Sequence, residues 1–239
     1  SLNLMELLIM VDALKRSSPA KITAVIPYYG YCRQDKKTKP REPITAKLVA
    51  NMIETAGVDR VIMFDLHVPQ VQGFFDIPSD NLDVMPLFAD YIAGKKLKDI
   101  VVVSPDAGGA ARARSFGKVL NAPIAIVDKR RPEQNVADVK NVIGDVRGKT
   151  AVLVDDIIDT AGSITEAANI LIKFGAKDVY ALATHGVLSN PALDRISKSI
   201  IKEVVVTNTI EIPKGKMISK LKVISIAPLL AETIKRTHE

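Results

Sequence analysis

The residues with the clearest chemical character lie in one short stretch of the chain. Asp155 and Asp156 follow the apolar run Ala-Val-Leu-Val, and a third carboxylate, Asp159, comes soon after them. Small and hydroxylated residues occupy positions 160–163, and a helical pattern follows over residues 164–174. The stretch therefore predicts a buried strand that delivers acidic side chains to its carboxyl end, with a helix starting behind them.

The chemistry expected of this stretch is the binding of a sugar phosphate. The first N–H groups of a helix lack intrahelical partners and carry the positive end of the helix dipole, so they attract a phosphate. Carboxylates beside that phosphate would repel it, unless they accept hydrogen bonds from vicinal sugar hydroxyls or face a bridging cation. Ordinary helix capping would account for Asp159 or Thr160, but not for Asp155 and Asp156 together.

Two further turns after expected strands carry polar residues. Residues 104–110 contain Asp106 and two glycines, which either admit a ligand close to the backbone or simply shape a tight turn. His67 also follows an apolar strand; a lone histidine there is more often structural, although a neutral imidazole can contact a metal or a phosphate. His185 and His238 receive the structural interpretation.

Clustered cations occur on two expected loops. The run Lys129 to Arg131 opens a polar loop over residues 128–141. Such a run is usually a solvated face; the functional alternative is an arm whose cations neutralise charge on a transferring phosphate. Residues 33–37 form a second loop suited to anions, because arginine makes bidentate phosphate contacts and lysine acts as a point charge.

Strand-like and helix-like segments alternate along the chain, which favours an α/β fold with parallel sheets and helices on their faces. Strands are expected over residues 22–26, 61–64, 100–103, 124–127, 151–154, 179–183 and 204–206, with the sheet ending at Ile224 and Ile226. Helices are expected over residues 4–14, 43–54, 85–92, 110–120, 164–174 and 228–236. Ligands of open α/β sheets bind at the carboxyl ends of the strands, where the acidic residues are expected.

We expect two tandem domains, over residues 1–79 and 80–239, with the last helix as a candidate to pack on the first domain. The first domain is expected to be an incomplete remnant, because the helix over residues 4–14 is too apolar to stand alone. The chain also begins with Ser1 and not with Met, which favours a piece that lacks an upstream segment.

Composition narrows the functional class. With 239 residues, of which 47% are hydrophobic, the chain can bury one large core or two modest ones. Its net charge of +6 is scattered over short groups, which argues against a nucleic-acid surface. A single cysteine, Cys32, fits a reducing compartment, and no apolar stretch approaches the roughly 20 residues of a membrane helix. A cytoplasmic protein without membrane or nucleic-acid partners is expected.

Several motifs, in order along the whole chain, closely resemble the ribose-phosphate pyrophosphokinase family in its bacterial form. They are YGYCRQDKKTKPREPITAKLVANMIETAG, DLHVPQVQGFFDIPSDNL, VVSPDAGGA, DKRRPEQNV, VLVDDIIDTAGS, THGVLS and VVVTNTI. The acidic stretch alone is similar to the phosphoribosyl-diphosphate loop of the type I phosphoribosyltransferase fold, but transferases lack the RQDKK, DLHxxQxQGFF and SPDAGGA segments as a set. The resemblance implies two tandem domains of that fold, the first one incomplete.

The resemblance also implies the reaction and its residues. Members of the family transfer the diphosphoryl group of ATP to the 1-hydroxyl of ribose 5-phosphate, with Mg²⁺ as cofactor, for nucleotide biosynthesis. Ribose 5-phosphate would be held by Asp155, Asp156, Asp159, Thr160, Ala161, Gly162 and Ser163. ATP would be bound by Arg33, Gln34 and His67, and magnesium by His67 and Asp106. The catalytic cations on the loop would be Lys129 and Arg131.

Two features qualify this expectation, and two alternatives remain open. The family begins upstream of Leu2 with a segment that helps to bind adenine across a subunit interface, and it continues past His238. Family membership further implies a homohexamer, which truncation would disturb. The alternatives are a phosphoribosyltransferase that consumes phosphoribosyl diphosphate with a base, and a catalytically impaired regulatory relative or fragment.

Overall fold

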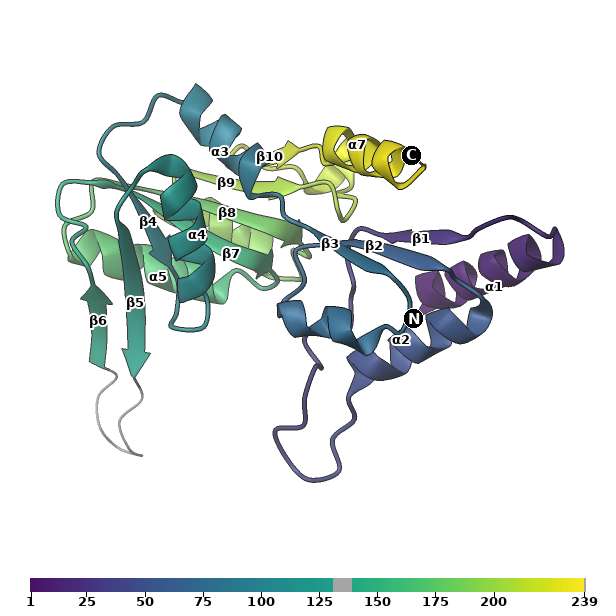
Figure 1. Cartoon of the computed structure of the whole chain (residues 1–239). Helices are drawn as coiled ribbons and strands as arrows, with labels where there is room; N and C mark the ends of the chain where they lie inside the picture. The colour runs from purple at the N-terminus through teal and green to yellow at the C-terminus, as the bar shows by residue number, and fades with distance from the viewer. Residues whose placement is uncertain (131–138, 239) are drawn as a thin grey trace. The chain divides into compact units, whose positions relative to one another are not determined.

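The computed structural model describes residues 1–130 and 139–238, and it divides the chain into two compact units, Ser1–Asp83 and Val84–Glu239. The division lies close to the domain boundary expected after residue 79. It falls after Asp83 because the strand at Ser79–Leu82 still pairs within the first sheet. Figure 1 shows the elements of both units along the chain.

Within the described residues, the first unit contains a three-stranded parallel sheet in the order β1-β2-β3. Its strands are β1 (Thr23–Ile26), β2 (Arg60–Phe64) and β3 (Ser79–Leu82). Its helices are α1 (Leu2–Arg16), α2 (Thr45–Ala56) and the 3-10 helix η1 (Pro69–Phe74). Strand β3 and helix η1 were not expected, because their short sequences carry little periodicity.

Helix α2 forms for the reasons that its sequence suggests. Val49, Ala50 and Ile53 are buried on one face, at the spacing of an amphipathic helix. The helix ends at Gly57, whose φ of 111° is a left-handed conformation that glycine adopts without a steric cost. It begins at Thr45, two residues after the proline expected to open it, and the Tyr29 hydroxyl donates to the Ala46 carbonyl at 2.7 Å.

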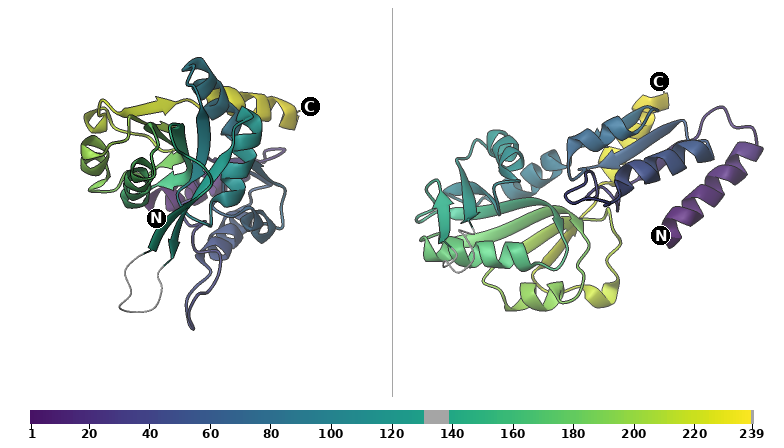
Figure 2. Two further views of the ribbon diagram at one scale, coloured as in Figure 1. Left: turned by 90° about the vertical axis from the view of Figure 1, so that its left-hand side faces the viewer. Right: turned by 90° about the horizontal axis from the view of Figure 1, so that it is seen from below.

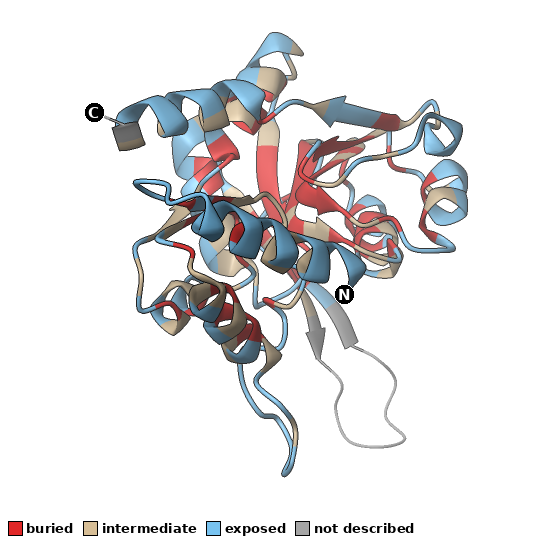
Figure 3. Cartoon of the chain, turned by 90° about the vertical axis from the view of Figure 1, so that its right-hand side faces the viewer, coloured by how far each residue is buried: buried red, intermediate tan, exposed pale blue. Residues whose placement is uncertain are grey.

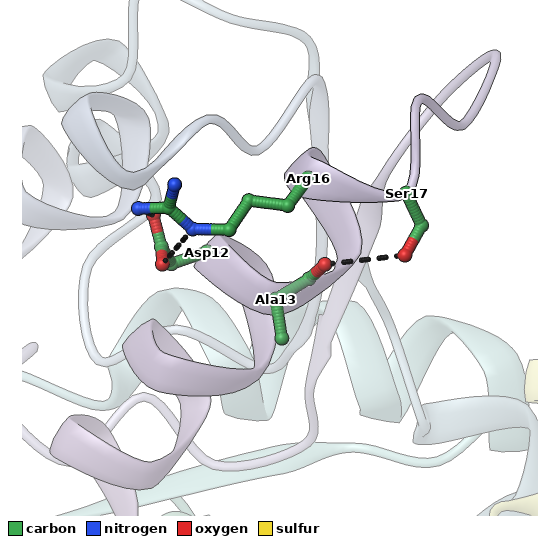
Figure 4. A network of polar contacts seen from close by, with 4 residues as sticks. All are labelled: Asp12, Ala13, Arg16 and Ser17. Carbon is green, nitrogen blue, oxygen red and sulfur yellow. Dashed lines mark hydrogen bonds and ion pairs between the residues drawn. The ribbon is translucent and has the colours of Figure 1, made fainter.

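Helix α1 is apolar on more than one face. Val11 is buried against the first unit's core, whereas Leu2 is 82% and Ile9 is 63% exposed. Polar contacts fix the carboxyl end of the helix (Figure 4): Arg16 Nε donates to Asp12 Oδ2 at 2.9 Å, and Ser17 Oγ donates to the Ala13 carbonyl at 3.3 Å.

In the described part of the second unit, seven strands form one sheet in the order β10-β9-β8-β7-β4-β5-β6. All neighbours are parallel except β5 and β6, which are antiparallel. The strands are β4 (Ile100–Ser104), β5 (Ile124–Arg130), β6 (Val139–Ile143), β7 (Thr150–Ile158), β8 (Asp178–Gly186), β9 (Glu203–Thr207) and β10 (Leu221–Ile224). The helices are α3 (Met85–Gly94), α4 (Ala110–Leu120), α5 (Gly162–Lys173), α6 (Ala192–Lys198), η2 (Lys214–Lys216) and α7 (Ala227–His238).

Both faces of this sheet are buried, as a parallel sheet requires. On one face, Val103 and Leu153 join a core with Leu171 of α5. The alternate residues Val102 and Val152 are also buried and lie on the opposite face, where α4 packs on β4 and β5. The right-hand view of Figure 2 shows α4 and α5 on opposite sides of the sheet, and Figure 3 shows the buried residues concentrated in its strands. The predicted α/β fold with parallel sheets is confirmed.

Several predicted boundaries in the second unit were wrong, and strand β8, expected to end at Ala183, runs to Gly186. Strand β7 was expected to end at Val154 but runs to Ile158, because its later residues continue to pair with β8. The polar loop expected over residues 128–141 is shorter, because the ends of β5 and β6 pair with each other from Ile126↔Ile143 to Arg130↔Val139. Residues 131–138 lie outside the described part of the chain. Helix α6 was not expected, because it is only two turns long.

Among the described residues, none of the helices combines the length and the apolar character that crossing a membrane requires.

Candidate active site

The polar residues of the second unit gather where its strand order changes direction. The chain winds from β4 outward through β5 and β6, then returns to β7 on the other side of β4. Ligands of open α/β sheets bind at such a switch point, outside the carboxyl ends of the strands. Asp155 and Asp156 lie near the carboxyl end of β7, and Asp106 lies in the turn after β4. The topology therefore places these three carboxylates at neighbouring strand ends.

Asp155 and Asp156 form an acidic pair near the carboxyl end of strand β7. Asp156 is only 6% exposed, and Asp155 Oδ1 accepts the N–H of Asp156 at 2.9 Å. Burial, followed by the hydrogen bond and the charge of Asp156, raises the pKa of Asp155 to about 8, and the positive charge of Arg112 on α4 opposes this shift. Two adjacent carboxylates in this setting favour ligands that donate hydrogen bonds to them. Arg112 was missed by sequence reasoning.

The turn over residues 160–163, called here the 160–163 turn, links the acidic pair to α5. Ala161 is buried and adopts a left-handed conformation with φ of 60°. Its carbonyl accepts the Thr165 N–H at 3.2 Å and the Thr165 hydroxyl at 2.8 Å. The Thr160 carbonyl accepts Nη1 of Arg195, from α6, at 3.0 Å. The backbone is thus held on both sides of a residue whose conformation costs about 1 kcal/mol.

Several residues of this segment are accessible to solvent. Thr160 and Ser163 are exposed, and Asp159 is half-buried. Helix α5 begins at Gly162, so the N–H groups of its first turn lie at this point of the chain. The structure therefore brings together the predicted ribose and phosphate residues 155–163 as one continuous strand end, turn and helix start.

Asp106 has a structural partner in the turn between β4 and α4. Its Oδ1 accepts the Gly109 N–H at 3.0 Å, and the Ser104 hydroxyl donates to its carbonyl at 2.6 Å. A Cβ at position 109 would lie 2.6 Å from Ser104 Oγ, so this turn requires glycine there. Asp106 itself is exposed, which keeps its second carboxylate oxygen accessible for a ligand.

The predicted nucleotide residues belong to the first unit. Arg33 and Gln34 are exposed on the loop between β1 and α2, and the Gln34 carbonyl accepts the Ala46 N–H at 3.2 Å. His67 is exposed in the segment after β2. Because β1 and β2 are parallel neighbours, both segments leave the same edge of the first sheet.

The two predicted catalytic cations are only partly described. Lys129 lies in β5, where its backbone pairs with Lys140 of β6. Arg131 falls outside the described residues. His185 is buried in β8, and its Nδ1 lies 2.9 Å from Thr209 Oγ1, which confirms its structural interpretation. In the described ranges, no group of three or more His, Cys, Asp or Glu side chains is placed to share a metal ion.

Comparisons with known proteins agree along the chain. The family model of the N-terminal domain of ribose phosphate pyrophosphokinase matches residues 1–57, and that of the phosphoribosyl synthetase-associated domain matches residues 135–239. The chain is similar to ribose-phosphate pyrophosphokinase of Bacillus subtilis (strain 168), with 62% identity over 237 residues, 99% of this chain and 75% of the relative. It is 61% identical, with the same coverage, to that of Corynebacterium ammoniagenes.

A solved structure also matches nearly the whole chain. The crystal structure of phosphoribosylpyrophosphate synthetase from Mycobacterium smegmatis superposes with a TM-score of 0.93 at 49% identity, covering 98% of this chain and 77% of that one. This likeness confirms the predicted type I phosphoribosyltransferase fold. The chain spans about three quarters of the length of these relatives.

Proposed function

The chain belongs to the ribose-phosphate pyrophosphokinase family of enzymes, and we propose that it transfers the diphosphoryl group of ATP to the 1-hydroxyl of ribose 5-phosphate. The observation that carries the proposal is the continuity of the acidic pair with the 160–163 turn. One short segment thereby offers acceptors for sugar hydroxyls and backbone donors for a phosphate.

Residues 155–163 are proposed to bind ribose 5-phosphate. The carboxylates of Asp155 and Asp156 accept hydrogen bonds from the vicinal hydroxyls, and Asp159 supplies a third acceptor at the edge. The backbone of residues 160–163, with the exposed hydroxyls of Thr160 and Ser163, holds the 5-phosphate. This arrangement leaves the 1-hydroxyl at the opposite end of the sugar from the phosphate.

In the proposed reaction, the oxygen of the 1-hydroxyl attacks the β-phosphorus of ATP. The bond between that phosphorus and the oxygen bridging to the α-phosphate breaks, AMP leaves, and the hydroxyl loses its proton. Such a transfer depends on in-line positioning and on neutralising charge, more than on covalent help from the protein. Lys129 and Arg131 are proposed to supply cations to the transferring group, and Arg33, Gln34 and His67 are proposed to bind ATP.

Mg²⁺ is the proposed cofactor, and the exposed carboxylate of Asp106 fits it because Mg²⁺ takes oxygen ligands and needs few from the protein. Asp106, in the second unit, and His67, in the first, are each proposed as a magnesium ligand on the family resemblance, and magnesium would neutralise the phosphates of ATP when bound. Assembly into a homo-oligomer such as a hexamer is a further proposal, which rests on the family resemblance alone. A cytoplasmic location is proposed from the composition, in which a single cysteine fits a reducing compartment.

The test is AMP formation from ATP and ribose 5-phosphate with no nucleobase present, followed by ³¹P NMR of the sugar product. We expect stoichiometric AMP and a 1-diphosphate signal. Base-dependent release of diphosphate, without AMP, would instead identify a phosphoribosyltransferase. Binding of both substrates without turnover would favour the impaired relative. The variant Lys198→Gln, which removes an exposed cation on α6, serves as the matched control and should retain full activity.

A further inference from the structure

Arg195 reaches from α6 to the 160–163 turn, although it is 35 residues away in the sequence. Its Nη1 donates to the Thr160 carbonyl at 3.0 Å. We infer that Arg195 is a positioning residue, which fixes the backbone donors of this turn for the 5-phosphate of the substrate. The inference rests on the proposed function, since it concerns the same site.

The contact acts through the planarity of one peptide group. In a trans peptide, the C=O of one residue and the N–H of the next point in opposite directions. When the guanidinium of Arg195 holds the Thr160 oxygen toward α6, the Ala161 N–H is directed away from α6. Thr165 holds the Ala161 oxygen in the same manner and thereby directs the Gly162 N–H.

These two anchored peptides stand on either side of the left-handed Ala161. A left-handed residue beside right-handed ones makes successive N–H groups converge into an anion-binding concavity. The conformation would relax without anchors, because a left-handed alanine is unfavourable. Arg195 therefore keeps the turn in its binding conformation before the ligand arrives, which lowers the cost of ordering on binding.

Gly162 explains how the guanidinium comes this close. A Cβ at position 162 would lie 3.3 Å from Arg195 Nη1, which is tighter than an ordinary contact. Glycine at the start of α5 therefore admits the arginine beside the turn. The same placement puts the guanidinium on the α6 side of the turn, opposite to the side that the Ala161 N–H faces.

The competing interpretation is that the hydrogen bond from Arg195 to the Thr160 carbonyl has no role in substrate binding. Exposed polar contacts of this kind contribute little to stability. The two interpretations differ in what they change. If the contact has no role in binding, replacing Arg195 changes the melting temperature alone. A positioning contact changes the affinity for ribose 5-phosphate and leaves the affinity for ATP unaltered.

The experiment measures the Kd of ribose 5-phosphate and of ATP by calorimetry on wild type, Arg195→Gln, Arg195→Lys and the control Lys198→Gln. We expect Arg195→Gln to bind ribose 5-phosphate about tenfold more weakly, as for a lost charged hydrogen bond in an accessible site, with ATP binding unchanged. Arg195→Lys keeps one charged donor and should recover part of the loss. Lys198→Gln should match wild type.

A double-mutant cycle of Gly162 and Arg195 tests the inference a second time. Gly162→Ala displaces the guanidinium without removing it, so its effect on ribose 5-phosphate affinity should be smaller in the Arg195→Gln background than in wild type. Equal affinity of Arg195→Gln and wild type, or an additive cycle, would overturn the inference while the proposed function stands. Failure of the wild type to bind ribose 5-phosphate would instead remove the proposed function itself.

Discussion

Replacing Asp155 with Asn should make the free protein more stable at alkaline pH. The pKa of Asp155 is raised from 3.8 to about 8 by burial and by Asp156. Between these values the folded state retains a proton that the unfolded state has lost, so stability falls as the pH rises toward 8. Asn cannot ionise, yet its side-chain oxygen still accepts the Asp156 N–H that Asp155 accepts at 2.9 Å.

The size of the effect follows from the same shift. About four pKa units would correspond to an upper bound of about 6 kcal/mol at 1.36 kcal/mol per unit. Water entry and rotation of the half-buried Asp155 carboxylate reduce this to roughly 2–3 kcal/mol, because the effective dielectric near such sites is well above that of a dry interior. For a chain of this size, that corresponds to a rise of roughly 5–10 °C in melting temperature.

The assay is thermal unfolding of wild type and Asp155→Asn between pH 5 and pH 9. We expect the advantage of the variant to grow from pH 5 to about pH 8 and to level off above that, because the folded and the unfolded wild type are then both ionised at position 155. Glu211→Gln removes a carboxylate from an exposed position and should show no such divergence. Unfolding midpoints of Asp155→Asn that follow those of wild type throughout this pH range would refute the reasoning about the acidic pair.

Three other predictions address the site. Binding of ribose 5-phosphate near pH 7 should release a proton, because hydroxyl donors lower the raised pKa of Asp155; calorimetry in buffers of different ionisation enthalpy measures this, and Asp155→Asn should abolish the release. Thr165→Val removes the hydroxyl that donates to the Ala161 carbonyl at 2.8 Å, and should weaken ribose 5-phosphate about fivefold in a direct binding assay, whereas unaltered affinity would count against an anchored turn. Lys129→Ala should lower kcat at least a hundredfold and leave the Kd of ribose 5-phosphate nearly unchanged; an equal loss of binding would contradict its assigned role.

The parts of the site that could be predicted from the sequence are those encoded over short distances. The apolar run before Asp155, and the helical pattern after Ser163, sufficed to predict a strand, a turn and a helix start. The extension of β7 to Ile158 could not be predicted in this way, because pairing with β8 decides it.

The missed residues share one physical cause. Arg195 donates a hydrogen bond to Thr160, which is 35 residues away in the sequence. The charge of Arg112 on helix α4 acts on Asp155 in strand β7. Neither contact leaves a periodic signal, since each depends on how α4 and α6 pack at the sheet. The glycine at position 162 was recognised as part of a motif, but its closeness to Arg195 becomes visible only in three dimensions.

The central claim is that the acidic pair and the 160–163 turn together hold ribose 5-phosphate. ¹⁵N-resolved NMR of the backbone amides during titration with this ligand tests it most directly. We predict large, saturable shifts at Ala161, Gly162 and Asp156, and with inorganic phosphate alone we predict shifts at the first two amides only. Saturable binding that leaves these amides unmoved would contradict the account.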